Sequence, residues 1–172
     1  HLASGDPDAL ALARRTADAA LERLSGSVAA IPHFPYPIPT GAKPHGLPMM
    51  WSLVLAELGA TLSDERYLEA AARFADEVFR DFHRRDRDLV LEFVRLDGGE
   101  LHTRQGAAVV PGHVVEDMWF QVHVAELLGS PAGRVEEAFR LILRHLELGW
   151  DASCGGGMLL AIDVGNSSTS LG

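Results

Sequence analysis

The sequence predicts an all-α fold built from pairs of inner and outer helices, with small β-hairpin excursions between the pairs. Helical segments that are apolar almost all round alternate with amphipathic ones, which predicts that buried helices alternate with half-exposed ones. The short extended stretches between them are bounded by glycine-rich turn signals, which is typical of hairpins. A chain of 172 residues is long enough for one domain with a sizeable core.

The first predicted helix covers residues 6–24. Asp6 is a suitable N-cap, and Pro7 would occupy the first helical position, where its missing N–H costs nothing. Apolar side chains recur at helical spacing along one face. They are Leu10, Ala13, Ala17, Leu21 and Leu24.

Residues 25–46 contain five of the nine prolines, too many for a regular helix. This segment is interpreted either as a long connector or as a loop that lines a pocket, because loops of this length are uncommon and often functional. In the second case several of its side chains could touch a ligand. They are His33, Phe34, Tyr36, Lys43 and His45.

Two helical hairpins are predicted from polarity. Residues 47–61 are apolar on all sides and predict a helix buried all round, whereas 64–82 are amphipathic and predict its outer partner. A helix opened by His113, over 113–128, and an amphipathic helix at 131–147 repeat this pattern. We therefore expect 47–61 and 113–128 to pack side by side, with the other two helices outside them.

The β excursions flank the second hairpin. Residues 89–96 predict a strand, 97–100 a turn, and 101–103 a returning strand, while 149–164 contains a glycine run and an extended stretch that is hairpin-like. On an alternating strand Glu92 would share the inward face of Val90 and Val94. A buried carboxylate is costly without a partner, so Glu92 is a candidate site residue unless it faces water at an edge.

Composition narrows the classes of partner. The net charge of −9 argues against nucleic acid or an anionic membrane as the main partner. Cys154 is the only cysteine, which excludes a disulfide within the chain and favours a reducing cytoplasm. No apolar run approaches the roughly 18–20 residues that span a bilayer. Nothing resembles a signal peptide, and the start at His1 suggests a fragment or a processed chain.

The stretch "VVPGHVVEDMWFQ" at 109–121 carries the main chemical candidates. His113 can take and return a proton near neutral pH, and Glu116, one turn later, could orient the imidazole or raise its pKa. Trp119 offers a flat apolar surface. Alternatively, Pro111 and Gly112 simply end a loop, His113 is the first residue of a helix, and Trp119 belongs to the core.

The sequence gives weaker signals for a bound metal or for a serine or cysteine nucleophile. The sequence has no His-Glu-x-x-His motif or cysteine pair for a metal, no Gly-x-Ser-x-Gly nucleophile elbow, and only Cys154, in a glycine-rich turn, as a thiol. No metal or cofactor is therefore expected. His83 and His145 fall among charged neighbours on amphipathic helices and are predicted to be solvated.

Five segments in order resemble the N-acylglucosamine 2-epimerase family, which includes renin-binding proteins and cellobiose 2-epimerases. They are "LPMMWSLVLAEL", "DERYLEAAARFADEVFRDF", "VLEFVRLDGGEL", "VVPGHVVEDMWF" and "GWDASCGGGMLLAIDV". The resemblance covers residues 46–164; residues 1–45 fit only as a preceding helix and loop, and 165–172 form a tail of uncertain origin.

The resemblance implies part of an (α/α)6 barrel whose inner helices line a sugar-binding cleft. It implies epimerisation or isomerisation of an N-acylhexosamine or an aldose, by removal and return of a proton beside a carbonyl, without a cofactor. His113 would match one of two acid–base histidines and Glu116 its acidic companion. Further side chains are expected to contact the sugar. They are Glu92, Trp119, Trp51, Trp150 and Asp151.

The departures from the family are also informative. A twelve-helix barrel needs well over roughly 300 residues, and the second acid–base histidine follows a Trp-Trp-Pro stretch that is absent here. An earlier family histidine would fall near 49–51, where there is none. We therefore expect the chain alone to be a poor epimerase. The competing interpretation is a non-catalytic helical module whose unfinished edge binds a partner or another copy of the chain.

The last 15 residues, 158–172, also resemble the opening of a type III pantothenate kinase. In that resemblance backbone amides and hydroxyls of an Asp-x-Gly-Asn-Ser turn face the phosphates of ATP. Asp163, Gly165, Asn166, Ser167 and Ser168 would fill these positions. No kinase body accompanies the turn, so a kinase-derived tail would not bring kinase activity.

Overall fold

The computed structural model describes residues 5–25, 37–153, 155–158 and 162–163. Its α-helices are α1 (Pro7–Leu24), α2 (Gly46–Leu62), α3 (Glu65–Glu77), α4 (Pro111–Leu128) and α5 (Ala132–Gly149). A π-helical turn, η2 (Val78–Phe82), extends α3, and a 3-10 turn, η3 (Gln105–Ala107), precedes α4. The strands are β1 (Ala42–Pro44), β2 (His83–Arg84), β3 (Leu89–Val90), β4 (Phe93–Arg95), β5 (Ala108–Val109) and β6 (Ile162–Asp163).

Aspartate caps start two of these helices. The Asp6 carboxylate accepts a hydrogen bond from the backbone N–H of Asp8 at 2.9 Å, and Pro7 follows it as the first helical residue, as the sequence predicts. The Asp64 carboxylate accepts from the N–H of Arg66 at 3.1 Å. Each cap satisfies a backbone donor that has no partner within the helix.

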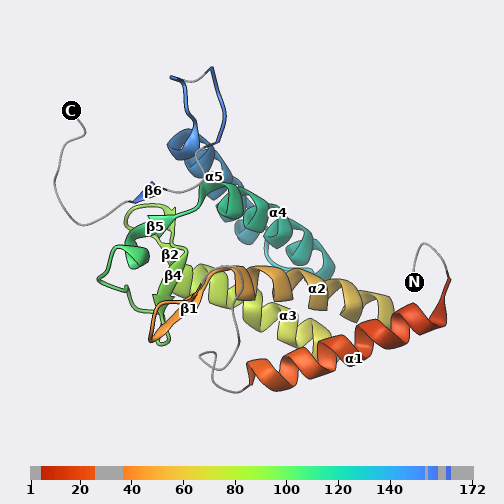
Figure 1. The fold of residues 1–172 in the computed structure, drawn as a ribbon. Helices are drawn as coiled ribbons and strands as arrows, with labels where there is room; N and C mark the ends of the chain where they lie inside the picture. The colour runs from red at the N-terminus through yellow and green to blue at the C-terminus, as the bar shows by residue number, and fades with distance from the viewer. Residues whose placement is uncertain (1–4, 26–36, 154, 159–161, 164–172) are drawn as a thin grey trace.

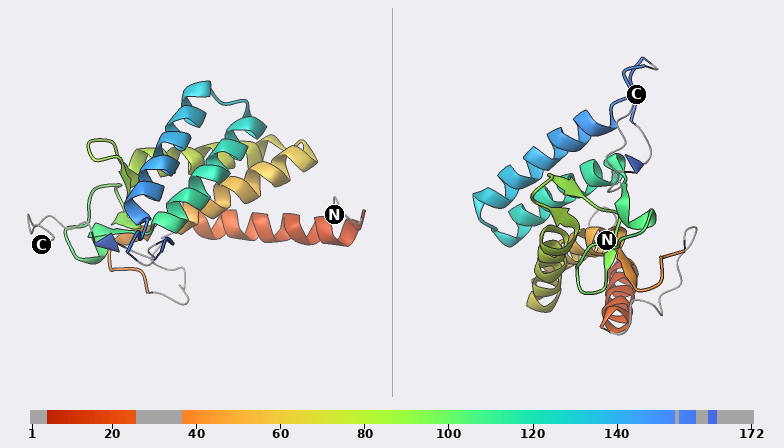
Figure 2. Two further views of the ribbon diagram at one scale, coloured as in Figure 1. Left: turned by 90° about the horizontal axis from the view of Figure 1, so that it is seen from above. Right: turned by 90° about the vertical axis from the view of Figure 1, so that its left-hand side faces the viewer.

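The helices form two adjoining pairs. Helices α2 and α4 lie side by side, α3 packs against α2, and α5 packs against α4 (Figures 1 and 2). This confirms the expected inner pair with outer partners, and the buried share of 47–61 slightly exceeds that of 64–82. The inner helix α2 is not buried all round, however. Met50 and Val54 are 46% and 41% exposed, because α1, α3 and α4 cover only part of its circumference.

The short strands gather at the end of the helices where α2 and α4 begin (Figure 1). The single strand predicted over 89–96 is wrong: β3 pairs with β2, and β4 pairs with β1, each antiparallel. The backbone changes partners between them, because Leu91 N–H donates to Phe82 O and Glu92 N–H to Ala108 O. The predicted returning strand at 101–103 does not form. Trp150 and Met158 form an antiparallel bridge, in keeping with the hairpin-like pattern of 149–164.

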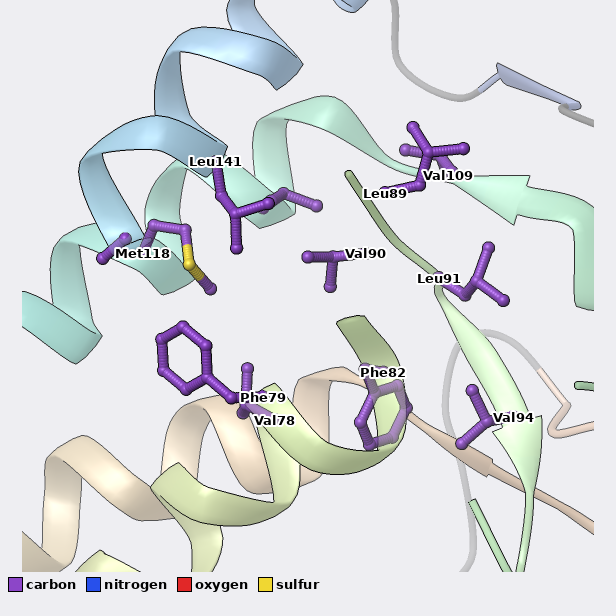
Figure 3. Close-up of a cluster of buried hydrophobic side chains, with 12 residues drawn as sticks. Val78, Phe79, Phe82, Leu89, Val90, Leu91, Val94, Val109, Met118 and Leu141 are labelled. Carbon is purple, nitrogen blue, oxygen red and sulfur yellow. The ribbon is translucent and has the colours of Figure 1, made fainter. Parts of the chain in front are cut away.

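An apolar cluster lies beneath this end of the molecule (Figure 3). Side chains of η2, of the segment 89–94, of α4 and of α5 converge there. The fully buried Phe82, Met118 and Leu141 represent three of these contributions. Truncating a buried side chain of this size to alanine costs about 2–5 kcal/mol. The cluster therefore fixes the start of α4 relative to the strands and to α5.

The solvated positions predicted for His83 and His145 are wrong. His145 is fully buried on α5: its Nε2 accepts from Val90 N–H at 3.2 Å, and its Nδ1 donates to Leu141 O at 2.8 Å. Its charged neighbours along the chain lie on the other face of α5, so they do not draw it into water. His83 belongs to β2 rather than a helix, and its Nδ1 lies 3.1 Å from Glu137 Oε1. Among the described helices, none has both the length and the apolar character required to cross a membrane.

Candidate functional site

His113 lies near the start of α4, with half of its side chain exposed. The helix begins at Pro111, two residues earlier than predicted, with Val110 as the N-cap. The fixed backbone angle of proline suits this first helical position. His113 is therefore the third residue of the helix, and 49% of its side chain is accessible to solvent.

Glu92 is the carboxylate that contacts His113. Its Oε2 lies 3.2 Å from His113 Nδ1, and its side chain is only 15% exposed. The backbone of Glu92 is held on both sides: its N–H donates to Ala108 O, and its carbonyl accepts from His45 N–H, each at 2.9 Å. The residue joins the start of α2 to the strand before α4, at the boundary between core and surface.

The carboxylates of Glu92 and Glu116 raise the pKa of His113 above its ordinary value. The hydrogen bond to Glu92 is the largest cause; partial burial opposes it, and the negative charges of Glu92 and then Glu116 add to it. The sequence had offered Glu116 as the group that orients the imidazole. In the structure Glu92 makes that contact, and Glu116 contributes only a weaker field from one turn away.

The contact also selects a tautomer. A carboxylate accepts hydrogen bonds, so His113 Nδ1–H donates to Glu92, and the neutral ring keeps its lone pair on Nε2. The side chain is half-exposed, so this nitrogen can take a proton from a bound molecule, and the nearby carboxylate stabilises the imidazolium that results. The arrangement therefore suits reversible proton transfer.

Two of the tryptophans expected at the sugar lie on the inner helices, Trp51 on α2 and Trp119 on α4. Trp119 is 60% exposed and stacks on His123, with ring centroids 6.2 Å apart and the planes 11° from parallel. Trp51 is half-buried and lines a groove between α1 and α2 together with Leu10. All residues that line this groove belong to α1 and α2, so Trp51 does not share it with His113.

Trp150 and Asp151 lie at the same end as His113. The backbone of Gly149 packs against Pro111: a Cβ on Gly149 would come within 2.7 Å of the proline ring. Asp151 closes the following turn, because its Oδ1 accepts from the N–H and the hydroxyl of Ser153 at 3.0 and 2.6 Å. The geometry gives Asp151 a turn-forming contact, while Trp150 remains 59% exposed.

Two candidates from the proline-rich loop, Lys43 and His45, belong to the described residues, and both are buried. Lys43 is buried and forms ion pairs with Glu77 and Asp81, both at 2.5 Å, so its charge is already engaged. His45 is fully buried at the start of α2. The remaining candidates of this loop and of the kinase-like tail lie outside the described residues, apart from the backbone of Asp163 in β6. These are His33, Phe34, Tyr36, Gly165, Asn166, Ser167 and Ser168, and the thiol candidate Cys154 lies outside the described residues as well.

Comparison with known proteins settles the family. The family model for N-acylglucosamine 2-epimerase (GlcNAc 2-epimerase) matches residues 1–170, almost the whole chain. The chain belongs to this family. It is 33% identical over 117 residues to the N-acylglucosamine 2-epimerase of Mus musculus and 30% identical over 116 residues to that of Rattus norvegicus. Each match covers 66% of this chain and 27% of the relative, so the chain spans about a quarter of their length.

A solved structure of the same kind shows the fold. The crystal structure of a sugar epimerase from a ruminal bacterium superimposes with a TM-score of 0.57 over 70% of this chain and 30% of that one, at 11% identity. The inner and outer pairs α2–α3 and α4–α5 are accordingly part of the (α/α)6 barrel of this N-acylglucosamine 2-epimerase family member. Within the described residues, no group of three or more His, Cys, Asp or Glu side chains could hold a metal ion.

Sequence reasoning missed Asp117 and Gln121, which lie on α4 next to this site. Both are buried, at 0% and 1% exposure, in the helix phase occupied by Val114 and Val124. Polar residues in the apolar phase of an otherwise buried helix were the available signal. Their partners come from α2, some 70 positions earlier, so the sequence alone does not identify them.

Proposed function

We propose that this chain supplies an acid–base histidine, His113, to a sugar 2-epimerase or isomerase acting on an N-acylhexosamine or an aldose. The observation that carries the proposal is the contact of His113 Nδ1 with Glu92, in a half-exposed side chain at the start of α4 whose other ring nitrogen is Nε2. Membership of the N-acylglucosamine 2-epimerase family supports the choice of substrate class.

The chemistry requires a proton to leave the carbon beside a carbonyl. Neutral His113 takes this proton from C2 of the open-chain sugar through Nε2, and the bonding electrons form an enediol-type intermediate. Glu92 balances the charge of the imidazolium and keeps its ring oriented. Return of the proton to carbon regenerates the neutral histidine.

Inversion at C2 makes a further demand. A base that stays on one face of the intermediate returns the proton to the face from which it came, so a single histidine exchanges protons or shifts the carbonyl but does not invert the carbon. Inversion needs a second acid–base group on the opposite face. The family resemblance assigns that task to a histidine that this sequence does not match, so we expect slow epimerisation by the chain alone.

The test is solvent exchange in heavy water. The purified chain is incubated with N-acetylmannosamine, N-acetylglucosamine or mannose, and C2 deuteration and epimer formation are followed by NMR, with His113→Asn as the matched control. We expect slow deuteration that depends on His113, with inversion slower still. Rapid inversion by the monomer would contradict the single-histidine interpretation. If there is no His113-dependent exchange and no sugar shifts the His113 resonances, the proposed function is wrong.

A non-catalytic helical module is the second candidate. The observation that favours it is the apolar groove between α1 and α2, lined by Leu10, Trp51 and Val54 among others. If binding another protein is the only function, Val54→Ser will weaken that association and His113→Asn will leave it unchanged. Where the partner is a second copy of the chain, concentration-dependent sedimentation of the chain, with and without each substitution, separates this candidate from the enzyme.

A further inference from the structure

A buried polar chain connects the two inner helices beside the site. His45 Nε2–H donates to Asp117 Oδ2 at 2.6 Å, and both side chains are fully buried. Asp117 Oδ1 accepts from Gln121 Nε2 at 2.7 Å, and the same amide group donates to Ser52 Oγ at 3.0 Å. The Ser52 hydroxyl in turn donates to Met49 O at 2.8 Å.

Stability alone does not explain this arrangement. Removing a carboxylate from water costs several kcal/mol in general, and a well-packed apolar pair often serves a helix interface as well or better. The network is also incompletely satisfied, because His45 Nδ1 and Gln121 Oε1 are buried and have no hydrogen-bond partner among the residues that the structure describes. A directional contact between α2 and α4 is thus retained where apolar packing would suffice.

The network is continuous with the candidate site. The backbone N–H of His45 holds Glu92 O at 2.9 Å, and the Glu92 carboxylate contacts His113. Asp117 follows His113 by four residues on α4, so the two share one side of the helix. Glu92, His45, Asp117 and His113 are therefore linked in a ring that joins the strand segment, α2 and α4; three of its links are hydrogen bonds, and the fourth is one turn of α4.

We propose that His45 and Asp117 are positioning residues, which fix the start of α2 against α4 so that Glu92 meets His113 at hydrogen-bonding distance. Neither touches Nε2 of His113. His45 acts through the backbone of Glu92, and Asp117 acts through one turn of α4. The role in catalysis rests on the proposed function, but the positioning itself does not.

Loss of the contact should free the start of α2 to move. Glu92 would then shift relative to His113, and the pKa of His113 would fall back toward its ordinary value, because the Glu92 hydrogen bond is the main reason that it is raised. In a sugar-converting enzyme, misplacement by about 1 Å costs about 10²-fold in rate. This loss should appear in kcat and not in KM.

The test is an NMR titration of His113 in the whole chain. Asp117→Asn keeps the size of the side chain but removes its charge. His45→Gln keeps a hydrogen-bond donor at this position and is the conservative variant. The double variant His45→Leu/Asp117→Leu replaces both partners with apolar groups, which is the change least harmful to folding. Tyr67→Phe is the matched control, because it removes the 2.7 Å hydrogen bond between Tyr67 and Asp18 at a distance from the ring.

We expect the pKa of His113 to fall in Asp117→Asn and in the double variant. It should stay close to the wild-type pKa in His45→Gln and be unchanged in Tyr67→Phe. An unchanged titration in a folded double variant overturns the proposal; if that variant does not fold, an unchanged titration in Asp117→Asn does so. Where C2 exchange is measurable, kcat should fall about 10²-fold in Asp117→Asn with KM unchanged. Absence of exchange in the wild-type chain counts against the proposed function and leaves the titration to decide the positioning role.

Discussion

His113 lies at the start of α4, and His145 lies near the end of the adjacent helix α5. The two residues have opposite electrostatic environments. His113 is half-exposed beside Glu92, and its pKa is raised. His145 is fully buried, with both ring nitrogens bonded to the backbone, and burial lowers its pKa to about 4. The first ring can change its protonation state at little structural cost, whereas the second must stay neutral for the core to persist.

The difference shows which environment suits a histidine to proton transfer and which suits it to the core. Both residues have a hydrogen-bond partner at Nδ1, so the presence of a partner does not distinguish them. His113 donates to a carboxylate, which favours the charged ring, while His145 donates to a carbonyl and accepts from Val90 N–H, which requires a neutral ring. The charge of the partner and the exposure of the side chain are what differ between the two residues.

The largest expected effect is on catalysis. In the protein that turns over the sugar, His113→Asn should lower kcat by about 10²–10⁴-fold with little change in KM, because the ring acts in the transition state. The fold should persist, since size and polarity are nearly kept. Equal rates of deuterium incorporation by the variant and wild type, in both directions of the reaction, would reduce His113 to a residue of the helix start.

The next effect is on stability in acid. Because the folded pKa of His145 is about 4, below its ordinary value of 6.5, the unfolded chain binds the proton more readily between these values. The stability contribution is complete above pH 6.5 and is lost as pH falls. Between pH 7 and pH 5 we expect a loss of about 2 kcal/mol from this group.

Urea unfolding at the two pH values measures that loss. His145→Gln can accept from Val90 N–H and donate to Leu141 O without titrating, so this variant should be somewhat less stable at pH 7 but should have a shallower pH dependence. The same pH dependence in variant and wild type would show that His145 is not the group responsible.

A smaller effect with the opposite sign is expected at the candidate site. The pKa of His113 is raised, so the interaction with Glu92 stabilises the fold below pH 6.5 and is lost as pH rises through the raised pKa. Glu92→Gln should therefore destabilise the chain more at pH 6 than at pH 9, by less than about 1 kcal/mol because His113 is half-exposed. Matched unfolding curves at both pH values test this. An equal loss at the two values would mean that Glu92 contributes packing rather than charge.

The smallest effect concerns Glu116. Its charge contributes least to the raised pKa of His113, so Glu116→Gln should lower that pKa by less than Glu92→Gln does. NMR titration of the two variants gives the order directly. The reverse order would restore Glu116, one turn along the helix, as the main partner of His113.

The sequence alone predicts the helices well, because periodicity and caps are local signals. Residues 7–24 and the inner–outer alternation follow from apolar spacing, and Asp6 acts as the expected cap. His145 could also have been placed correctly, since it continues the buried phase of Ala138 and Leu141 on α5. The charged residues near it along the chain, Arg144 and Glu147, obscure this helical spacing in the sequence.

The β excursions and the site contacts were harder to predict because they depend on distant residues. The 89–96 segment looks like one strand, but β4 pairs with β1 about 50 positions earlier, inside a proline-rich stretch. The sequence identifies Glu92 as a carboxylate in an apolar run, yet only the fold brings it to His113. The motif at 109–121 thus points to His113 as a candidate but not to Glu92, the carboxylate that contacts it.

The order in which these contacts form during folding follows from their separation along the chain. The α2–α3 and α4–α5 hairpins close through short loops, with Ser63 and Gly129 in the left-handed conformation at their turns. Such local contacts form early, whereas Glu92–His113 and His45–Asp117 join residues 21 and 72 positions apart. The ring at the start of α4 can therefore close only after the two hairpins have docked. The titration of one histidine would then report, in a refolding experiment, when the two halves of this chain first meet in register.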